Sequence, residues 1–289
     1  MKTVLLCFCI ATASSVFALD FTAPIEKLGG DFKFSEGPLW VAANNELLFS
    51  DIPANRIVSF HAGKFATSRA PSNNANGLTL DKQGRLIACE HGARRVTRTE
   101  TDGSITVLAE RHDGKRLNSP NDVVVRKDGA IYFTDPPYGV KPEERELDFQ
   151  GVYRISPAGK TLTLLAKDFV KPNGLAFAPD EKILYVNDTE GGHIRAFDIA
   201  ADGTLTNSRI FAKTPGADGM KVDSEGNIYC TSTEGVMVFD HSGKHLGTFV
   251  TAEQPANCAF GDVDWRSLYM TCRTGLYRVR LAVPGIKVP

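Results

Sequence analysis

No hydrophobic run in this 289-residue sequence is long enough to cross a membrane as a helix. The apolar stretch from Val4 to Ala13 falls short of the roughly 20 residues that a membrane span needs. It follows Lys2 and precedes Val16-Phe17-Ala18, an ending of the kind that signal peptidase accepts. We therefore expect residues 1–18 to be a cleaved secretory signal rather than an anchor, with export to a periplasm or the extracellular space.

The sequence also lacks an excess of charge of either sign, with 33 basic and 34 acidic residues. Removing residues 1–18 takes away one basic residue, Lys2, and leaves 32 basic and 34 acidic residues, a formal charge of −2. Proteins that bind nucleic acid or anionic membranes usually carry a basic excess. We therefore expect neither partner here.

Cysteine is scarce, and no two cysteines form a Cys-x-x-Cys pair. The four that lie outside the expected signal are Cys89, Cys230, Cys258 and Cys272. Each lies in or beside an apolar segment, where cysteine is most often simply buried. An exported protein could instead join Cys258 to Cys272 by a disulfide, and the sequence leaves both possibilities open.

What the sequence does contain is one unit repeated six times. The clearest copy, residues 121–135, is an apolar segment, a Lys-Asp-Gly turn and a second apolar segment ending in Asp135. Every copy opens with a residue that carries a side-chain oxygen. These six residues are Glu36, Asn76, Asn121, Asn173, Asp218 and Asn257, with spacings of 40, 45, 52, 45 and 39 residues.

The repeat predicts the fold. The second apolar segments are residues 46–50, 85–89, 130–134, 183–187, 227–231 and 267–271, and two more strands fit into each remaining period. Four short strands about every 45 residues are typical of a propeller blade. We therefore expect an all-β protein, a six-bladed β-propeller with four antiparallel strands per blade and no helix, as one domain over residues 19–289.

The last copy is one strand short, with strands expected only from Asn257, Ser267 and Leu276. A propeller must tie its ends together to close the ring. We therefore expect the mature N-terminal segment, about Phe21 to Leu28, to supply the missing outer strand. Because a closed ring leaves no long free sheet edge, we expect a monomer.

The opening residues of the six copies define a candidate site. The first strand of each blade lines the central channel of a propeller, so its opening residue lies at the channel mouth. Asn and Asp are also common before strands because they satisfy turns. Two carboxylates and four amides without Cys or His are, however, the donor set of a hard cation such as Ca²⁺, Mg²⁺ or Mn²⁺.

The loops that follow the second strands border the same mouth. They contain His91 and Tyr138, which we regard as candidates for substrate contacts, the alternative for each being a structural role. The pair Arg94-Arg95, just beyond His91, is more typical of a solvated strand face.

At these residues the sequence resembles the gluconolactonase/regucalcin family of six-bladed propellers. The resemblance spans nearly the whole expected mature chain, through residues 35–38, 117–122, 132–136, 172–177 and 218–223. Any one of these motifs is weak evidence, whereas five in order at blade spacing are specific. The resemblance implies one divalent cation at the channel mouth and the hydrolysis of lactones.

The resemblance also implies a role for individual residues. The metal ligands would be Glu36, Asn173 and Asp218, with Asn121 close by or as a fourth ligand, and Asp218 would be the general base as well. Asn76 and Asn257 fall outside the family's ligand set and would support it from neighbouring positions.

One position departs from the animal regucalcins. They carry an Arg that contacts sugar hydroxyls two places before the Asn121 position, and here that place is Ser119. The chain therefore resembles the bacterial-type gluconolactonases more closely. The expected substrate contacts are Ser119 and Asn121, together with His91 and Tyr138.

These inferences predict a metal-dependent hydrolase that opens a lactone, most simply a sugar lactone such as gluconolactone. We expect Ca²⁺, with Mg²⁺, Mn²⁺ or Zn²⁺ as alternatives. The cation would stabilise negative charge on the carbonyl oxygen while Asp218 takes a proton from water. Because a cation lowers the pKa of a carboxylate that ligates it, Asp218 could instead only orient a water that the cation acidifies.

Two other functions remain open. A propeller of this kind could use its cation to hold a ligand without catalysis, since a fold does not determine a function. The same site could also act on another ester or a phosphotriester, which the apolar segment Pro136-Pro137-Tyr138 would suit.

Overall fold

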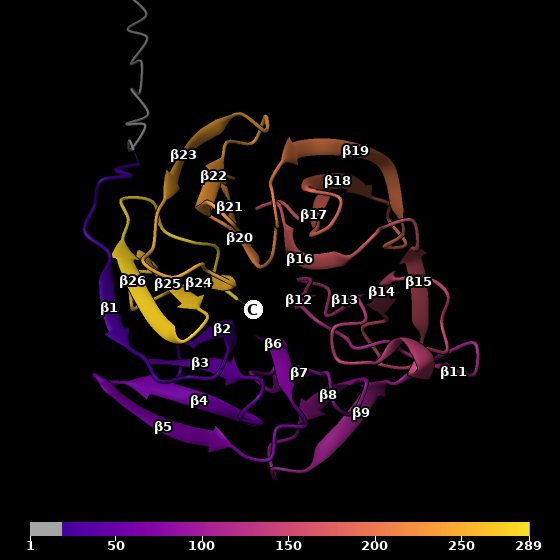
Figure 1. Cartoon of the computed structure of the whole chain (residues 1–289). Coiled ribbons are helices and arrows are strands. Elements are labelled where there is room, and N and C mark those ends of the chain that lie inside the picture. Colours follow the sequence, from indigo (N-terminus) through magenta and orange to yellow (C-terminus); the bar gives the residue numbers. More distant parts are fainter. Residues whose placement is uncertain (1–18, 289) are drawn as a thin grey trace, which may run out of the picture.

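The computed structural model describes residues 19–288, so the expected signal at residues 1–18 lies outside the described residues. Six four-stranded antiparallel sheets surround a central channel as the blades of a propeller (Figure 1). The predicted six-bladed β-propeller is therefore confirmed. Within residues 19–288, no helix is long and apolar enough to span a membrane.

Each blade begins with a strand next to the channel. These inner strands are β2 (Ser35–Val41), β6 (Ala75–Leu80), β12 (Val123–Val125), β16 (Pro172–Phe177), β20 (Met220–Val222) and β24 (Asn257–Gly261). The second strands are β3 (Glu46–Asp51), β7 (Leu86–Glu90), β13 (Ile131–Asp135), β17 (Ile183–Asp188), β21 (Ile228–Ser232) and β25 (Ser267–Cys272).

The outer half of each blade is more exposed. The third strands are β4 (Arg56–His61), β8 (Arg95–Thr99), β14 (Gly151–Ile155), β18 (His193–Ile199), β22 (Gly235–Phe239) and β26 (Gly275–Arg280). The outermost strands are β5 (Lys64–Arg69), β9 (Ile105–Ala109), β15 (Leu162–Ala166), β19 (Leu205–Lys213), β23 (His245–Phe249) and β1 (Glu26–Gly29). Strand β13 is buried along its whole length because neighbouring blades cover both of its faces, whereas β5 is almost entirely exposed.

The N-terminal strand closes the ring, as predicted. Strand β1 pairs antiparallel with β26, with Glu26 opposite Arg278 and Lys27 opposite Tyr277. The strand begins at Glu26 rather than near Phe21, because Phe21 packs against Phe249 of the preceding blade at 4.9 Å between ring centroids. The expected position was therefore correct, and its start was about five residues early.

Two small elements between β9 and β14 interrupt the expected pattern. Strands β10 (Arg111–His112) and β11 (Lys115–Arg116) form a hairpin, and residues Pro142–Glu144 form a 3₁₀ helix. The prediction that the chain has no helix was therefore wrong at this one turn. The hairpin ends the second repeat, just before Asn121, whereas the 3₁₀ helix lies in the third and longest repeat, whose 52-residue spacing leaves room for it.

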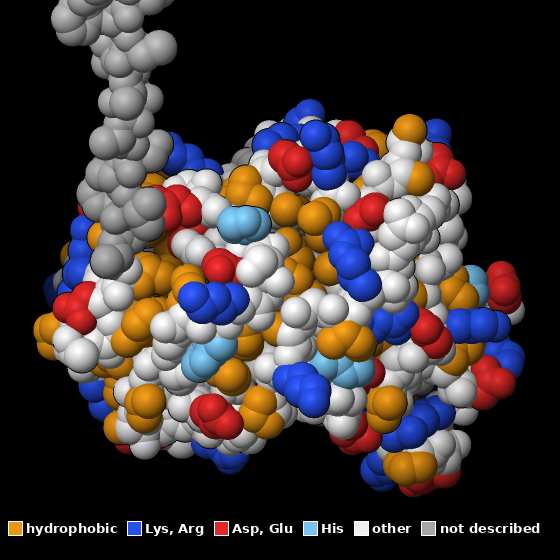
Figure 2. All heavy atoms as spheres, turned by 90° about the horizontal axis from the view of Figure 1, so that it is seen from above, with side chains coloured by type: hydrophobic (Ala, Val, Ile, Leu, Met, Phe, Trp, Pro, Cys, Tyr) orange, Lys and Arg blue, Asp and Glu red, His pale blue; other side chains and the backbone are white. Residues whose placement is uncertain are grey.

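The four described cysteines are all buried and free, so the disulfide alternative for Cys258 and Cys272 was wrong. Cys258 lies opposite Met270 in the ladder, and Cys272 lies two residues beyond Met270. Such diagonal neighbours have side chains roughly 7 Å apart, whereas a disulfide needs Cβ atoms about 4 Å apart. On the face drawn in Figure 2, acidic and basic side chains are interspersed, as the balanced composition predicts.

Candidate active site at the channel mouth

Close contact between blades sets the positions of the mouth residues. The Gly77 N–H donates to the Asn121 carbonyl at 2.8 Å, and the Gly174 N–H donates to the Asp218 carbonyl at 3.0 Å. A Cβ on Gly174 would lie 2.3 Å from that Asp218 oxygen, so only glycine fits there. The Asn-Gly and Asp-Gly pairs that open the copies thus reflect the approach of the next blade.

Three of the six opening residues form a continuous row of amides. Asn76 Nδ2 donates to Asn121 Oδ1 at 2.7 Å, and Asn121 Nδ2 donates to Asn173 Oδ1 at 2.6 Å. Asn173 Nδ2 then donates to the Tyr138 hydroxyl at 3.2 Å and to Thr189 Oγ1 at 3.1 Å. The row orients each amide, and it brings together residues 97 positions apart in the chain.

The two acidic opening residues, Glu36 and Asp218, are close enough for the charge of one to shift the pKa of the other. Burial raises the pKa of Glu36 to about 7, and the charge of Asp122 adds to the rise. The hydrogen bond from the Gly37 N–H (2.7 Å), a bond from Asn257 and the charge of Lys221 lower the pKa in part. Burial, followed by the charge of Glu36, also raises the pKa of Asp218 well above its usual value. Both carboxylates cannot be ionised here at low cost unless a cation is present.

Asp122 is a third acid at this site, and our sequence analysis gave it no role. Its side chain is buried, Oδ1 accepts the Val123 N–H at 2.9 Å, and Oδ2 has no hydrogen-bond partner among residues 19–288. Its charge raises the pKa of both Glu36 and Asp218. The signal in the sequence was an acid at a position where four of the six copies have glycine.

The donor set fits a hard divalent cation. Glu36, Asp122 and Asp218 place three acids around one region, and Asp122 Oδ2 and Asn76 Oδ1 are buried without partners in the described chain. Among residues 19–288, no three His, Cys, Asp or Glu side chains are close enough to hold a cation by themselves, so a cation here would also need amide oxygens such as those of Asn173 and Asn121. Carboxylate and amide oxygens suit Ca²⁺ or Mg²⁺ better than Zn²⁺, which prefers nitrogen and sulfur ligands.

His91 lies within the amide row, 94% buried. Its Nε2 is 3.2 Å from Asn121 Oδ1 and 3.4 Å from Asn76 Nδ2. Burial lowers the pKa of His91 to about 4, although the bond to Asn121 opposes this. The imidazole is therefore neutral at neutral pH, and it holds Asn121 in the orientation that the row requires.

Ser119 and Tyr138 belong to one loop structure beside the mouth. The fully buried Ser119 Oγ donates to the Pro136 carbonyl at 2.7 Å and accepts the Gly139 N–H at 2.8 Å. These bonds hold both ends of the segment that carries Tyr138, whose side chain is 45% exposed. Pro136 and Pro137 are buried, so Tyr138 is the part of the predicted apolar segment that a ligand can contact.

The expectation of a solvated Arg94-Arg95 pair was wrong for Arg94. Arg94 is buried, and its guanidinium donates to the carbonyls of Leu117 at 2.7 Å, Asn118 at 3.0 Å and Glu144 at 3.0 Å. These carbonyls lie 23 to 50 residues away in the sequence and take the place of water around the guanidinium. No local sequence pattern could therefore show that Arg94 is buried. Arg95 is partly buried and pairs with Glu90 at 2.7 Å.

Comparison with known proteins shows which family the chain resembles. Residues 34–274 match the model of the SMP-30/gluconolactonase/LRE-like region. A gluconolactonase of Zymomonas mobilis is 32% identical over 302 aligned positions, which cover 92% of this chain and 84% of the relative. The solved structure of a gluconolactonase from Xanthomonas campestris is 40% identical, with a TM-score of 0.84 and 90% of each chain covered.

A more distant structure has the same fold. The calcium-binding protein regucalcin from Agrobacterium tumefaciens is 21% identical, with a TM-score of 0.79 over 92% of this chain and 97% of that one. The family match covers most of the chain, and all five motifs of the resemblance fall within it. The chain therefore belongs to the SMP-30/gluconolactonase/LRE-like family.

Proposed function

We propose that this protein hydrolyses a lactone at the channel mouth and that its substrate is a sugar lactone such as gluconolactone. The observation that carries the proposal is the pairing of Glu36 with Asp218 at one end of a row of oriented amides. The gluconolactonase relatives from Zymomonas mobilis and Xanthomonas campestris support the choice of reaction. The proposed location is outside the cytoplasm, after removal of residues 1–18.

The proposed cofactor is one divalent cation, Ca²⁺ in the first place. Glu36, Asn173 and Asp218 would hold it, with Asn121 beside them, and the calcium-binding neighbour from Agrobacterium tumefaciens supports this choice of metal. When bound, the cation supplies electrostatic stabilisation for the negative charge that develops on the lactone carbonyl oxygen.

The proposed mechanism uses the protein's own groups to move protons. Asp218 is partly exposed, so a water that attacks the carbonyl carbon can reach it and transfer a proton to its carboxylate. The bond from the carbonyl carbon to the ring oxygen then breaks, and Asp218 returns the proton to that oxygen to give the hydroxy acid. Burial and the charge of Glu36 raise the pKa of Asp218, which opposes the lowering that a cation causes and preserves its basicity.

The neighbouring residues orient the substrate. Tyr138 is 45% exposed, and its hydroxyl can exchange its bonds to Thr189 and Asn173 for a bond to a substrate hydroxyl. Ser119 acts through the loop, because both of its hydrogen bonds go to loop backbone. His91 acts through Asn121, since it is buried within the row and neutral.

A pH-stat assay of the chain from residue 19 onwards tests the proposal on a panel of lactones, with and without a chelator. We expect acid release from aldonolactones, loss of release with chelator, and recovery with Ca²⁺. Asp218→Asn should lower turnover by at least about 10²-fold, because it removes both a base and a ligand charge. His91→Ala should cost about 10-fold, as expected for a residue that positions another.

Two results would contradict the assignments. Near wild-type turnover by Asp218→Asn, with cation binding preserved in calorimetry, would exclude Asp218 as the base. No acid release from any lactone, with cation shown to bind, would favour a binding protein instead. Aryl esters and a phosphotriester belong in the same panel, and faster turnover of these than of aldonolactones would reassign the substrate class.

A further inference from the structure

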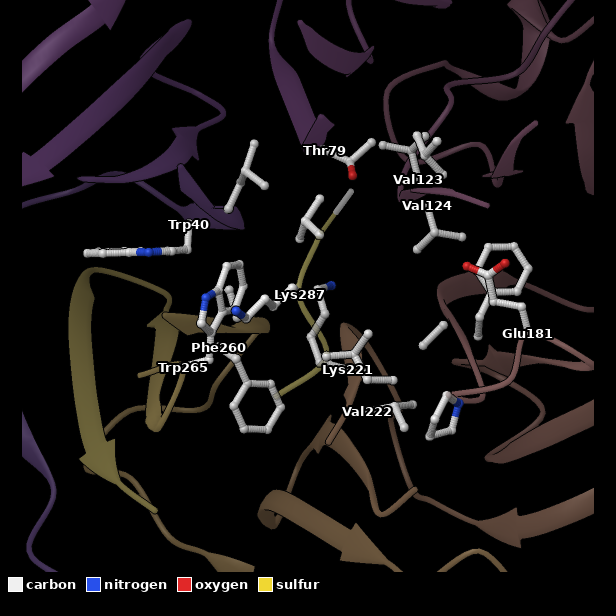
Figure 3. A pocket seen from close by; sticks show the side chains of 18 of the residues that line it. Trp40, Thr79, Val123, Val124, Glu181, Lys221, Val222, Phe260, Trp265 and Lys287 are labelled. Carbon is white, nitrogen blue, oxygen red and sulfur yellow. The ribbon is translucent and has the colours of Figure 1, made fainter. Parts of the chain in front are cut away.

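A cavity of about 180 Å³ lies in the channel beyond the mouth residues (Figure 3). Its walls are residues of the six inner strands and of turns that follow some of them, together with residues 286–288. None of the six opening residues of the mouth lines this cavity, and Trp40 lies four residues after Glu36 on the same strand. This lower cavity is therefore separate from the carboxylate pair.

The surface of the lower cavity is mainly apolar. Figure 3 shows Trp40, Val124, Val222, Phe260 and Trp265 around the space. Apolar cavities of about 150 Å³ in proteins remain dry and accept molecules of the size of benzene. The size of this cavity therefore fits a small molecule with an apolar body.

The charge that the cavity offers is positive. Lys221 and Lys287 extend into the space in Figure 3, and neither forms an ion pair within residues 19–288. The Lys221 ammonium donates to the Met220 carbonyl at 3.0 Å, which leaves two of its three protons free. Glu181, an acid of the same lining, already accepts the Lys127 N–H at 3.1 Å and lies 4.0 Å from Arg126.

Backbone hydrogen bonds hold the lysine-bearing segment in place. Three backbone hydrogen bonds fix residues 284–286. The Pro284 carbonyl accepts the Ser224 N–H at 2.9 Å, and the Gly285 N–H donates to the Trp265 carbonyl at 2.8 Å. The Ile286 N–H donates to the Val222 carbonyl at 3.2 Å. A Cβ on Gly285 would lie 2.0 Å from Phe260, so this segment is seated tightly on the inner strand. Lys287 follows directly, and its position beside the cavity is part of the fold.

We propose that the lower cavity is a second ligand site, one that binds a small monocarboxylate with an apolar body. The carboxylate would pair with Lys221 and Lys287, and the hydrocarbon would pack against Trp40, Phe260 and Trp265. Lys221 is partly buried, and an unpaired ammonium in such an apolar setting attracts an anion more strongly than one in water does. This site requires neither a cation nor the hydrolysis of lactones.

The two tryptophans of the chain, Trp40 and Trp265, both line this cavity, so intrinsic fluorescence reports on it directly. The wild-type chain would be titrated with hexanoate, hexan-1-ol and acetate in chelator, so that no cation at the mouth can bind the carboxylate. We expect a saturable change in emission and a matching heat in calorimetry for hexanoate. Binding of hexan-1-ol and of acetate should each be at least 10-fold weaker.

Variants locate the site. Lys287→Met and Lys221→Met should each weaken hexanoate at least about fivefold and leave hexan-1-ol unchanged. Lys244→Met, at an exposed turn, is the matched control and should bind as wild type. If Lys221→Met fails to fold, the result for Lys287→Met is decisive, because Lys287 is exposed.

Three results would overturn the proposal. The first is the absence of a saturable signal up to about 10 mM hexanoate, which corresponds to a binding free energy weaker than about −3 kcal/mol. The second is equal affinity for hexanoate and hexan-1-ol, which would remove the role of the lysines. The third is wild-type affinity in Lys287→Met.

Discussion

Asp122 occupies a position at which four of the six repeats have glycine. In those repeats the neighbouring blade lies against the glycine, as Asn76 does at Gly37. In the third repeat the Asp122 side chain instead adds a buried negative charge near Glu36 and Asp218. One oxygen of this carboxylate has no hydrogen-bond partner within the described residues. A single residue thus converts a packing position into part of the electrostatics of the site.

Asp122→Asn should therefore weaken the binding of the divalent cation by about 10-fold, since it removes one of three acidic charges at nearly constant shape. Calorimetric titration with Ca²⁺ measures this. Asp128→Asn, in the exposed β12–β13 turn, is the control and should leave the affinity unchanged. Unchanged affinity in Asp122→Asn would mean that this carboxylate lies too far from the cation to contribute to its binding.

At the scale of the element, the segment between β13 and β14 is the part of the mouth that is built from a loop. Ser119 bonds to the backbone of residues 136 and 139, and Arg94 bonds to three carbonyls around the same loop. Tyr138 then bridges from this loop to Asn173 and Thr189 in the next blade. The loop's position is therefore determined by contacts on both of its sides.

Ser119→Ala should raise KM for the lactone several-fold and change kcat little, because it frees the loop without touching the carboxylates. The free energy of unfolding should fall by about 1 kcal/mol for the lost hydrogen bonds. If Ser119 acts through the loop, Tyr138→Phe should have less effect in the Ser119→Ala background than in the wild type. Fully additive effects on KM would instead indicate that Ser119 contacts the substrate itself.

At the scale of the whole molecule, one carboxylate reinforces the closure of the ring. Glu253 accepts bonds from the Lys27 ammonium (3.0 Å), the Thr274 N–H (2.9 Å) and the Tyr277 hydroxyl (2.8 Å), and it thereby ties β1 to β26. Burial alone would raise the pKa of Glu253, but these bonds together lower it to about 2. The ionised form therefore stabilises the closed ring.

Glu253→Gln should lower the free energy of unfolding at pH 7 by about 1–2 kcal/mol, after allowance for solvent screening. Because the folded-state pKa is depressed, this stabilisation is present above pH 4.5 and is lost as the pH falls toward 2. The difference between variant and wild type in chemical denaturation should shrink over that range. Glu234→Gln, at an exposed turn, is the control, and a difference independent of pH would contradict the assignment.

Lys221 links the two ends of the channel. It lines the lower cavity, and its charge also lowers the pKa of Glu36 at the mouth. Lys221→Met should therefore tighten Ca²⁺ binding several-fold, because it removes a positive charge that repels the cation. Calorimetry at pH 8.5 avoids competition from a proton on Glu36, whose pKa is about 7. Weaker binding in this variant would show that Lys221 instead supports the carboxylates.

The sequence by itself determined the six blades, the second strands to within a residue or two, the closing N-terminal strand and the six opening residues of the mouth. These follow from local patterns, because strand alternation, turn chemistry and a repeat spacing are written in neighbouring residues. Only the tertiary structure decided which opening side chains bond to one another, that Arg94 is buried and that Asp122 joins the acids. It also decided that Cys258 and Cys272 are diagonal neighbours. Each of these depends on distances between blades or on the register of two strands, and burial and charge act through space rather than along the chain.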